Sequence, residues 1–382
     1  MYEYTGDRKY LDAVATIADE IVARNQIATH AVWNDINQNK YCEGCGAVDW
    51  FLLNCELWQF TGDTRYLDRA ETILYSALYY MQDHRGGFSC TAHQDTGRLW
   101  ASLRDVAWCC TQKGAIGLCR AVQSCVASDE TGVYVNFFMP MQVKVSVQGR
   151  PVTFRMDTDY PNTGKLAMTV IEAPDEEVCM RIRVPAWSAL EGVRLNGQTM
   201  KQEPAGGYIA ISRPWRKGDA LEVELAVNVH LRKGLSGRVG EALEMAEENG
   251  EKQIEAAALY WGPVMLGLKS AEQPVKRYTL VVPSIKSASD PGILPTATLP
   301  ASEKTVFSVP NAYLRVLLSR DGFPPPSERK LEPEDINQLP IVTLVPLSEV
   351  FTGEALGIFD VRSPADGNCI GMASRRLEED QE

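Results

Sequence analysis

The feature that most constrains the fold of this chain is a segment of eight residues that occurs twice. Residues 5–12 read Thr-Gly-Asp-Arg-Lys-Tyr-Leu-Asp, and residues 61–68 repeat six of these eight letters in register. In each copy the glycine can end one helix in a left-handed turn, and the aspartate can cap the next helix. A repeating unit that holds two helices predicts stacked helical hairpins, which bury their apolar faces against one another.

The first third of the chain is therefore expected to be helical. After the second copy, apolar residues recur at helical spacing at Leu67, Ala70, Leu74, Ala77, Leu78 and Met81. We predict helices over residues 7–24, 43–60, 64–82 and 104–126, with loops over 25–40 and 84–98.

From residue 131 the pattern changes to short β-rich runs between turn residues. Strands are predicted at regular intervals up to Leu225, as in Val143-Lys144-Val145-Ser146-Val147, and this spacing is typical of an antiparallel β-sandwich. The predicted organisation is multidomain, α then β. It has a helical domain over 1–130, a β-sandwich domain over 131–270, a further β-rich segment over 271–347 and a poorly ordered tail over 348–382.

Composition excludes several classes of partner. The chain has 382 residues and a net charge of -12, which argues against a surface for nucleic acid or for an anionic membrane. No apolar run approaches the ~20 residues of a membrane span. Ten cysteines are too few for a disulfide scaffold in a chain of this length. These cysteines, with no secretory leader at Met1, lead us to expect a cytoplasmic protein.

A carboxylate and three cysteines stand out as a candidate metal site. Glu43-Gly44-Cys45 precedes the adjacent pair Cys109 and Cys110. Adjacent cysteines rarely form a disulfide with each other, because the required geometry is strained. Three sulfurs and a carboxylate can fill the tetrahedral shell of zinc. Two other interpretations remain open here: a purely structural zinc, and a redox pair formed by Cys42 and Cys45.

Several motifs in a fixed order carry a resemblance to a known family. The two repeated segments flank Glu-x-Cys, and the paired cysteines follow. A Gly-Val-Tyr-Val-Asn strand, Thr158-Asp159-Tyr160-Pro161, the run at 181–187 (Arg-Ile-Arg-Val-Pro-Ala-Trp) and the runs at 207–219 and 258–263 come next. In this order the chain resembles the β-L-arabinofuranosidase family of glycoside hydrolases (family 127, the DUF1680 group), over residues 4–270.

The resemblance implies a fold and a chemistry. It implies an (α/α)6 toroid followed by β-sandwich domains, with Zn2+ bound by Glu43, Cys45, Cys109 and Cys110. It also implies retaining hydrolysis of a carbohydrate substrate, a pentoside, with Cys109 as the nucleophile. A zinc thiolate can fill that role, because the metal holds the sulfur ionised.

Two departures from the family pattern bear on activity. The family's acid/base glutamate has no counterpart in the stretch before Glu43, where Asp35 and His30 are the substitutes that can carry a proton. Residues 111–113 (Thr-Gln-Lys) replace the family's Pro-Pro-Asn. This second departure concerns the identity of the substrate more than the binding of zinc.

The predicted helices are also too few for a closed toroid. The chain therefore resembles an amino-terminally truncated member, active or inactive, and exposed apolar helix faces predict self-association or pairing with a missing amino-terminal half. The alternative function is a non-catalytic carbohydrate-binding or scaffold protein with a structural zinc.

Overall fold

The computed structural model describes residues 1–34, 41–83, 86–95, 98–101, 108–233 and 255–269, together with short strands between Arg277 and Ala373. The chain divides into two compact units. Unit 1 comprises Met1–Trp50, Thr72–Gly114 and Val229–Glu382. Unit 2 comprises Phe51–Glu71 and Ala115–Asn228.

Helices form where the repeat predicts them. They are α1 (Tyr2–Thr5), α2 (Lys9–Arg24), α3 (Gly44–Thr61), α4 (Arg65–Thr72), α5 (Tyr79–Met81) and α6 (Trp108–Ser124), with a π-helical segment η1 (Ile73–Leu78) between α4 and α5. The helical prediction is confirmed for the described residues, except that the predicted helix over 64–82 contains η1 and ends at Met81, and the one over 104–126 ends at Ser124. Residues 104–107 lie outside the described residues.

The two copies of the repeat fold into the same turn. Gly6 and Gly62 have φ angles of 67° and 72°, so each ends its helix in the left-handed region that glycine tolerates. The carboxylate of Asp7 accepts a hydrogen bond from the Lys9 N–H at 3.1 Å, and that of Asp63 accepts one from the Arg65 N–H at 3.0 Å. Each aspartate thus satisfies an amide at the start of the next helix.

One predicted loop contains a hairpin instead. Strands β1 (Ala92–Asp95) and β2 (Arg98–Ala101) pair antiparallel, with Asp95 opposite Arg98. The sequence-based expectation of a loop over 84–98 was wrong there, because polar residues such as Gln94 conceal the strand pattern. Backbone pairing between the two strands forms this hairpin.

The other described strands of unit 1 follow residue 228. They are β13 (Val229–Lys233), β14 (Glu255–Trp261), β15 (Val264–Lys269), β16 (Arg277–Val281), β17 (Leu294–Leu299), β18 (Lys304–Val309), β19 (Tyr313–Val316), β20 (Val342–Pro346), β21 (Glu354–Leu356), β22 (Ile358–Val361) and β23 (Ile370–Ala373). The last three lie within 348–382, where the sequence predicted a poorly ordered tail. These three strands form by pairing with strands that are distant in the sequence, as β22 pairs with β14. Sequence composition does not reveal such pairing.

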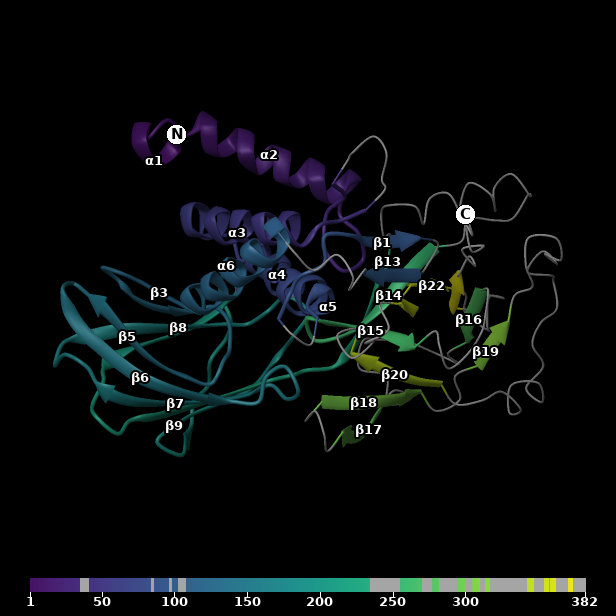
Figure 1. Cartoon of the computed structure of the whole chain (residues 1–382). Helices are drawn as coiled ribbons and strands as arrows, with labels where there is room; N and C mark the ends of the chain where they lie inside the picture. The colour runs from purple at the N-terminus through teal and green to yellow at the C-terminus, as the bar shows by residue number, and fades with distance from the viewer. Residues whose placement is uncertain are drawn as a thin grey trace. The chain divides into compact units, whose positions relative to one another are not determined.

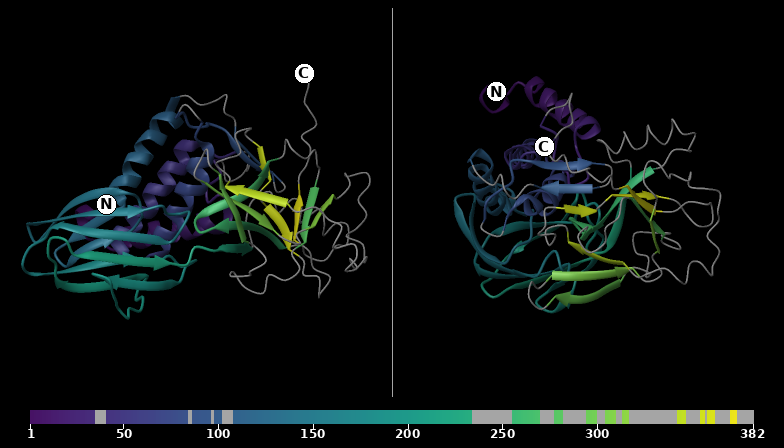
Figure 2. Two further views of the ribbon diagram at one scale, coloured as in Figure 1. Left: turned by 90° about the horizontal axis from the view of Figure 1, so that it is seen from below. Right: turned by 45° about the vertical axis from the view of Figure 1, so that its right-hand side comes forward.

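Unit 2 contains two sheets (Figures 1 and 2). The larger has the order β10-β9-β12-β7-β6-β5 and the smaller β11-β8-β4-β3. Burial alternates along strands such as β7, as expected for a strand with one covered face. The bounds are β3 (Val126–Asp129), β4 (Gly132–Val135), β5 (Met141–Val147), β6 (Arg150–Thr158), β7 (Lys165–Glu172), β8 (Glu177–Arg183), β9 (Leu190–Leu195), β10 (Gln198–Thr199), β11 (Tyr208–Pro214) and β12 (Ala220–Leu225).

A buried ion pair lies in the core of unit 2. Arg183 and Glu71 have fully buried side chains, with Nη2 of the arginine 2.6 Å from Oε2 of the glutamate. The Tyr160 hydroxyl donates a hydrogen bond of 2.7 Å to Oε1 of Glu71, and the Trp187 indole N–H donates one of 3.4 Å to Oε2. The motifs around Tyr160 and Arg183 therefore serve packing between α4 and the strands.

Among the described residues, no helix is both long enough and apolar enough to cross a membrane.

Candidate metal centre

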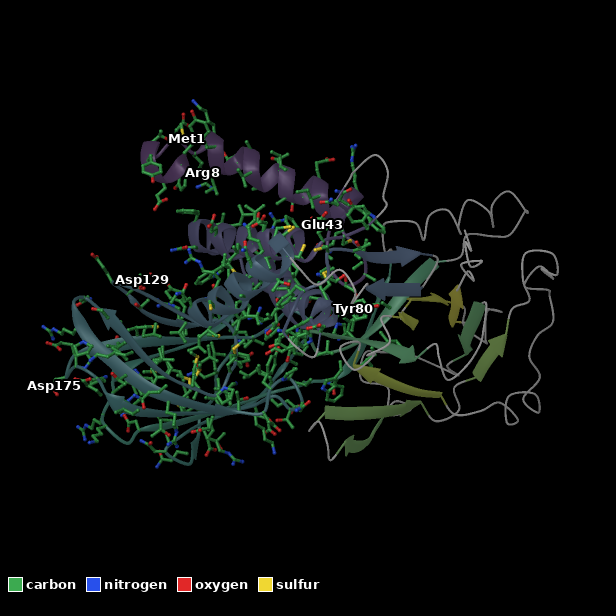
Figure 3. All side chains as sticks on the ribbon, viewed as in Figure 1. Met1, Arg8, Glu43, Tyr80, Asp129 and Asp175 are labelled. Carbon is green, nitrogen blue, oxygen red and sulfur yellow. The ribbon has the colours of Figure 1, made fainter. Side chains whose placement is uncertain are left out.

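Four potential metal ligands come together in unit 1. Glu43 immediately precedes α3, Cys45 lies in the first turn of α3, and Cys109 and Cys110 lie in the first turn of α6. One carboxylate oxygen and three sulfurs from these residues all lie within 4.8 Å of one another. Figure 3 labels Glu43 at this end of α3, with sulfur atoms beside it. The structure thus brings together all four residues that the sequence indicated.

The distances in the group suit a tetrahedral ion. The two sulfurs of Cys109 and Cys110 lie 3.9 Å apart, and ligands bound to zinc at ~2.3 Å in tetrahedral geometry are separated by ~3.8 Å. The Cys45 thiol donates a hydrogen bond of 3.0 Å to Oε2 of Glu43. Three thiolates and a carboxylate form a donor set that zinc accepts, so the residues fit this metal.

Burial divides the group into a closed side and an open side. Cys110 is completely buried, Glu43 and Cys45 are half-buried, and Cys109 is exposed. Burial raises the pKa of Cys45 to about 12, and the hydrogen bond with Glu43 contributes. Burial also raises the pKa of Cys110. Thiolates in such a place need a compensating cation, which a divalent metal provides.

The backbone of residues 88–89 holds the first turns of α3 and α6 in place. The N–H of Gly44 donates to the carbonyl of Ser89 at 3.0 Å, and the N–H of Phe88 donates to the Thr111 hydroxyl at 3.1 Å. The segment around Phe88 therefore joins the start of α3 to the start of α6.

Cys42 lies apart from the group of ligand atoms. Its backbone pairs with that of Ala92, and burial raises the pKa of its thiol. A reactive redox cysteine needs a lowered thiol pKa and access to solvent. The structure therefore disfavours the interpretation of Cys42 and Cys45 as a redox pair.

Sequence reasoning missed several polar neighbours. The Asn34 side chain donates a hydrogen bond of 2.9 Å to Oε1 of Glu43. Lys113 forms an ion pair with Asp49 at 2.7 Å, which raises the lysine pKa. Lys113 follows Cys109 by four residues on α6, and Asp49 follows Cys45 by four on α3. Residues four apart lie on the same face of a helix, so Lys113 shares a face with Cys109 and Asp49 shares one with Cys45. That spacing could have identified Lys113 and Asp49 as neighbours of the proposed ligands.

His30, one of the two acid/base candidates from the sequence, is not among the four grouped residues. His30 is buried in a turn with a φ angle of 65°, and its ring lies edge-on to that of Tyr260 at 6.4 Å. This is the environment of a packed histidine. Asp35 lies outside the described residues.

Two family models match most of the helical region and the sheets of unit 2. The model described as "Beta-L-arabinofuranosidase, GH127 catalytic domain" matches residues 1–122, and the "GH127 middle domain" model matches residues 132–227. No curated protein matches the sequence.

Solved structures share the fold. A GH127 beta-arabinofuranosidase has 19% identity and a TM-score of 0.66, and its match covers 98% of this chain and 57% of that one. A structure described as a glycoside hydrolase has 18% identity and a TM-score of 0.71, covering 98% and 64%. A GH127 beta-L-arabinofuranosidase from Geobacillus stearothermophilus T6 has 18% identity and a TM-score of 0.69, covering 94% and 57%. This chain therefore spans less than two thirds of each.

Proposed function

Because this chain belongs to the GH127 β-L-arabinofuranosidase family of glycoside hydrolases, we propose that it is a zinc-dependent retaining glycoside hydrolase that cleaves a pentoside. The observation that carries this proposal is the convergence of Glu43, Cys45, Cys109 and Cys110 within 4.8 Å, with only Cys109 exposed. Glu43, Cys45 and Cys110 are the proposed permanent ligands, and Cys109 is the proposed nucleophile.

The proposed reaction has two steps. The Cys109 thiolate attacks the anomeric carbon, a carbon–sulfur bond forms, and the bond to the aglycone oxygen breaks as that oxygen takes a proton from a general acid. Water then attacks the same carbon, gives up a proton to the conjugate base, and displaces Cys109 as a thiolate. Two inversions retain the configuration of the sugar.

The chain's residues divide these tasks by position. When bound, zinc supplies the positive charge that keeps buried sulfurs ionised near neutral pH. Exposure lets Cys109 reach a sugar, whereas complete burial confines Cys110 to holding the metal. Asp35 remains the candidate acid, because His30 is packed against Tyr260.

The finer architecture is part of the same proposal. The helices represent part of an (α/α)6 toroid and the two sheets of unit 2 a β-sandwich, with domains divided at residues 130, 270 and 347. A second copy or a separate amino-terminal half would cover the apolar side chains that α6 exposes, Ile116 at 49% and Val122 at 48%.

Loss of the exposed thiol tests the proposal. We expect Cys109→Ala to abolish cleavage of an aryl β-L-arabinofuranoside, measured by release of the aryl alcohol. Cys119→Ala is the matched control, because Cys119 is also exposed on α6 but lies outside the ligand group. Wild-type protein that binds zinc and cleaves no pentoside would contradict the proposal and favour a non-catalytic scaffold with structural zinc.

A further inference from the structure

Backbone hydrogen bonds hold Trp33 and Asn34 firmly in unit 1. Trp33 donates its N–H to the carbonyl of Asn25 at 3.0 Å, and the Asn25 side chain donates back to the Trp33 carbonyl at 3.3 Å. Trp33 itself is buried. The next residue, Asn34, donates its N–H to the carbonyl of Tyr41 at 2.8 Å. The backbone of Asn34 is therefore fixed close to the start of α3.

From this position the Asn34 side chain contacts one oxygen of a proposed metal ligand. Its Nδ2 lies 2.9 Å from Oε1 of Glu43, while Oε2 of the same carboxylate accepts the hydrogen bond from Cys45. A carboxylate accepts hydrogen bonds, so the donor facing it is the amide NH2 of Asn34. The two oxygens of Glu43 thus have different partners, and Oε2 is the one turned toward sulfur.

We propose that Asn34 is a positioning residue that presents Oε2 of Glu43 to the metal and keeps Oε1 occupied. This inference rests on the metal centre in the proposed function. Groups that hydrogen-bond to ligands fix their orientation, and losing one typically lowers metal affinity 10–100-fold. Because Asn34 is exposed, a loss near the lower end of that range is expected. With Asn34, Glu43 supplies one oxygen; without it, both oxygens are available to the ion.

Substitutions at Asn34 separate the hydrogen bond from the shape of the side chain. Asn34→Leu keeps the branched shape of the side chain and removes the donor. Asn34→Gln keeps the NH2 group on a side chain one methylene longer. Gln112→Leu is the matched control, because it removes an exposed amide from the first turns of α6, outside the ligand group. Asn34→Ala replaces the leucine variant if circular dichroism shows that the latter is misfolded.

Cobalt(II) is the probe, because its absorption reports both binding and coordination number without any substrate. We expect wild-type protein, Asn34→Gln and Gln112→Leu to bind cobalt with affinities within a few-fold of one another, with strong d–d bands typical of four ligands. Asn34→Leu is expected to bind about tenfold more weakly, with weaker d–d bands because Glu43 supplies a second oxygen.

The cobalt measurements test the positioning role of Asn34 independently of any hydrolase activity. Wild-type affinity and band intensity in Asn34→Leu would overturn the inference, as would a wild-type protein that binds no cobalt. If the leucine variant is impaired and the glutamine variant is not, the inference stands even when no pentoside is cleaved. That last result would contradict only the proposed hydrolase activity.

Discussion

The glycine between two proposed metal ligands is required by close packing. A Cβ at Gly44 would lie 3.0 Å from the Ser89 carbonyl oxygen, 3.3 Å from Cβ of Phe88 and 3.5 Å from Cβ of Cys110. Backbone cannot move away cheaply at such a distance. Gly46, one residue beyond Cys45 in the same helix, has open space around the same position.

These two glycines give a matched pair of predictions at the scale of a residue. Gly44→Ala should destabilise the protein by about 1–3 kcal/mol through overpacking and weaken zinc binding, because the first turn of α3 must move. Gly46→Ala should stabilise the protein by about 0.5–1 kcal/mol, since alanine is the better helix former. Urea unfolding and competition with a zinc chelator measure both effects. Equal effects of the two substitutions would contradict the packing argument.

The sequence indicates the proposed ligands more readily than the residues that support them. Glu43, Cys45, Cys109 and Cys110 are recognisable because sulfur and carboxylate chemistry points to a metal and because the motif order resembles a family. No sequence motif indicates the hydrogen bond from Asn34 to Glu43. It depends on backbone pairing among Asn25, Trp33 and Tyr41, and no residue pattern encodes that pairing.

At the scale of an element, the turn between β11 and β12 depends on one carboxylate. Asp219 is 7% exposed, and it accepts hydrogen bonds from the Asn196 side chain at 2.8 Å and the Arg216 N–H at 2.9 Å. Burial opposes ionisation, but these hydrogen bonds and the nearby Arg213 and Arg216 prevail and lower the aspartate pKa. The ionised form therefore stabilises the turn.

This shift predicts a pH dependence. A lowered pKa in the folded state contributes stability that is complete above the unfolded value of ~3.9 and is lost as pH falls through the folded value. Asp219→Asn should cost about 2 kcal/mol at pH 7, and its difference from wild type should shrink below pH ~4. Urea unfolding at several pH values measures this difference. Asp175→Asn, at an exposed turn residue, is the control, and a constant cost for Asp219→Asn across pH would refute the assignment.

Elements differ in how well the sequence predicts them. The strands of unit 2 have buried residues at alternate positions, as β7 and β12 show, so their pattern is visible in the sequence. The pairing of β1 with β2 and the strands after residue 348 arise from hydrogen bonding with partners elsewhere in unit 1. Local composition does not record such partners.

At the scale of the whole molecule, the proposed ligands connect separate parts of the sequence within unit 1. Glu43 and Cys45 belong to Met1–Trp50, whereas Cys109 and Cys110 belong to Thr72–Gly114. A metal bound only by the folded protein stabilises it, by about 4 kcal/mol at a thousandfold excess over Kd. The four proposed ligands are all in unit 1, so this stabilisation should be local.

Metal removal should therefore loosen a defined set of segments. After chelation with EDTA, we expect faster amide hydrogen exchange at residues 41–50, 86–92 and 108–114, because opening there no longer has to break metal bonds. Exchange within strands β5 to β12 of unit 2 should be unchanged. Mass spectrometry of peptides from protein with and without zinc measures both regions. Cys110→Ser should reproduce the chelated pattern without EDTA, whereas Cys119→Ser should behave as wild type. Faster exchange throughout unit 2, or no change at residues 108–114, would contradict a metal site formed by these four residues.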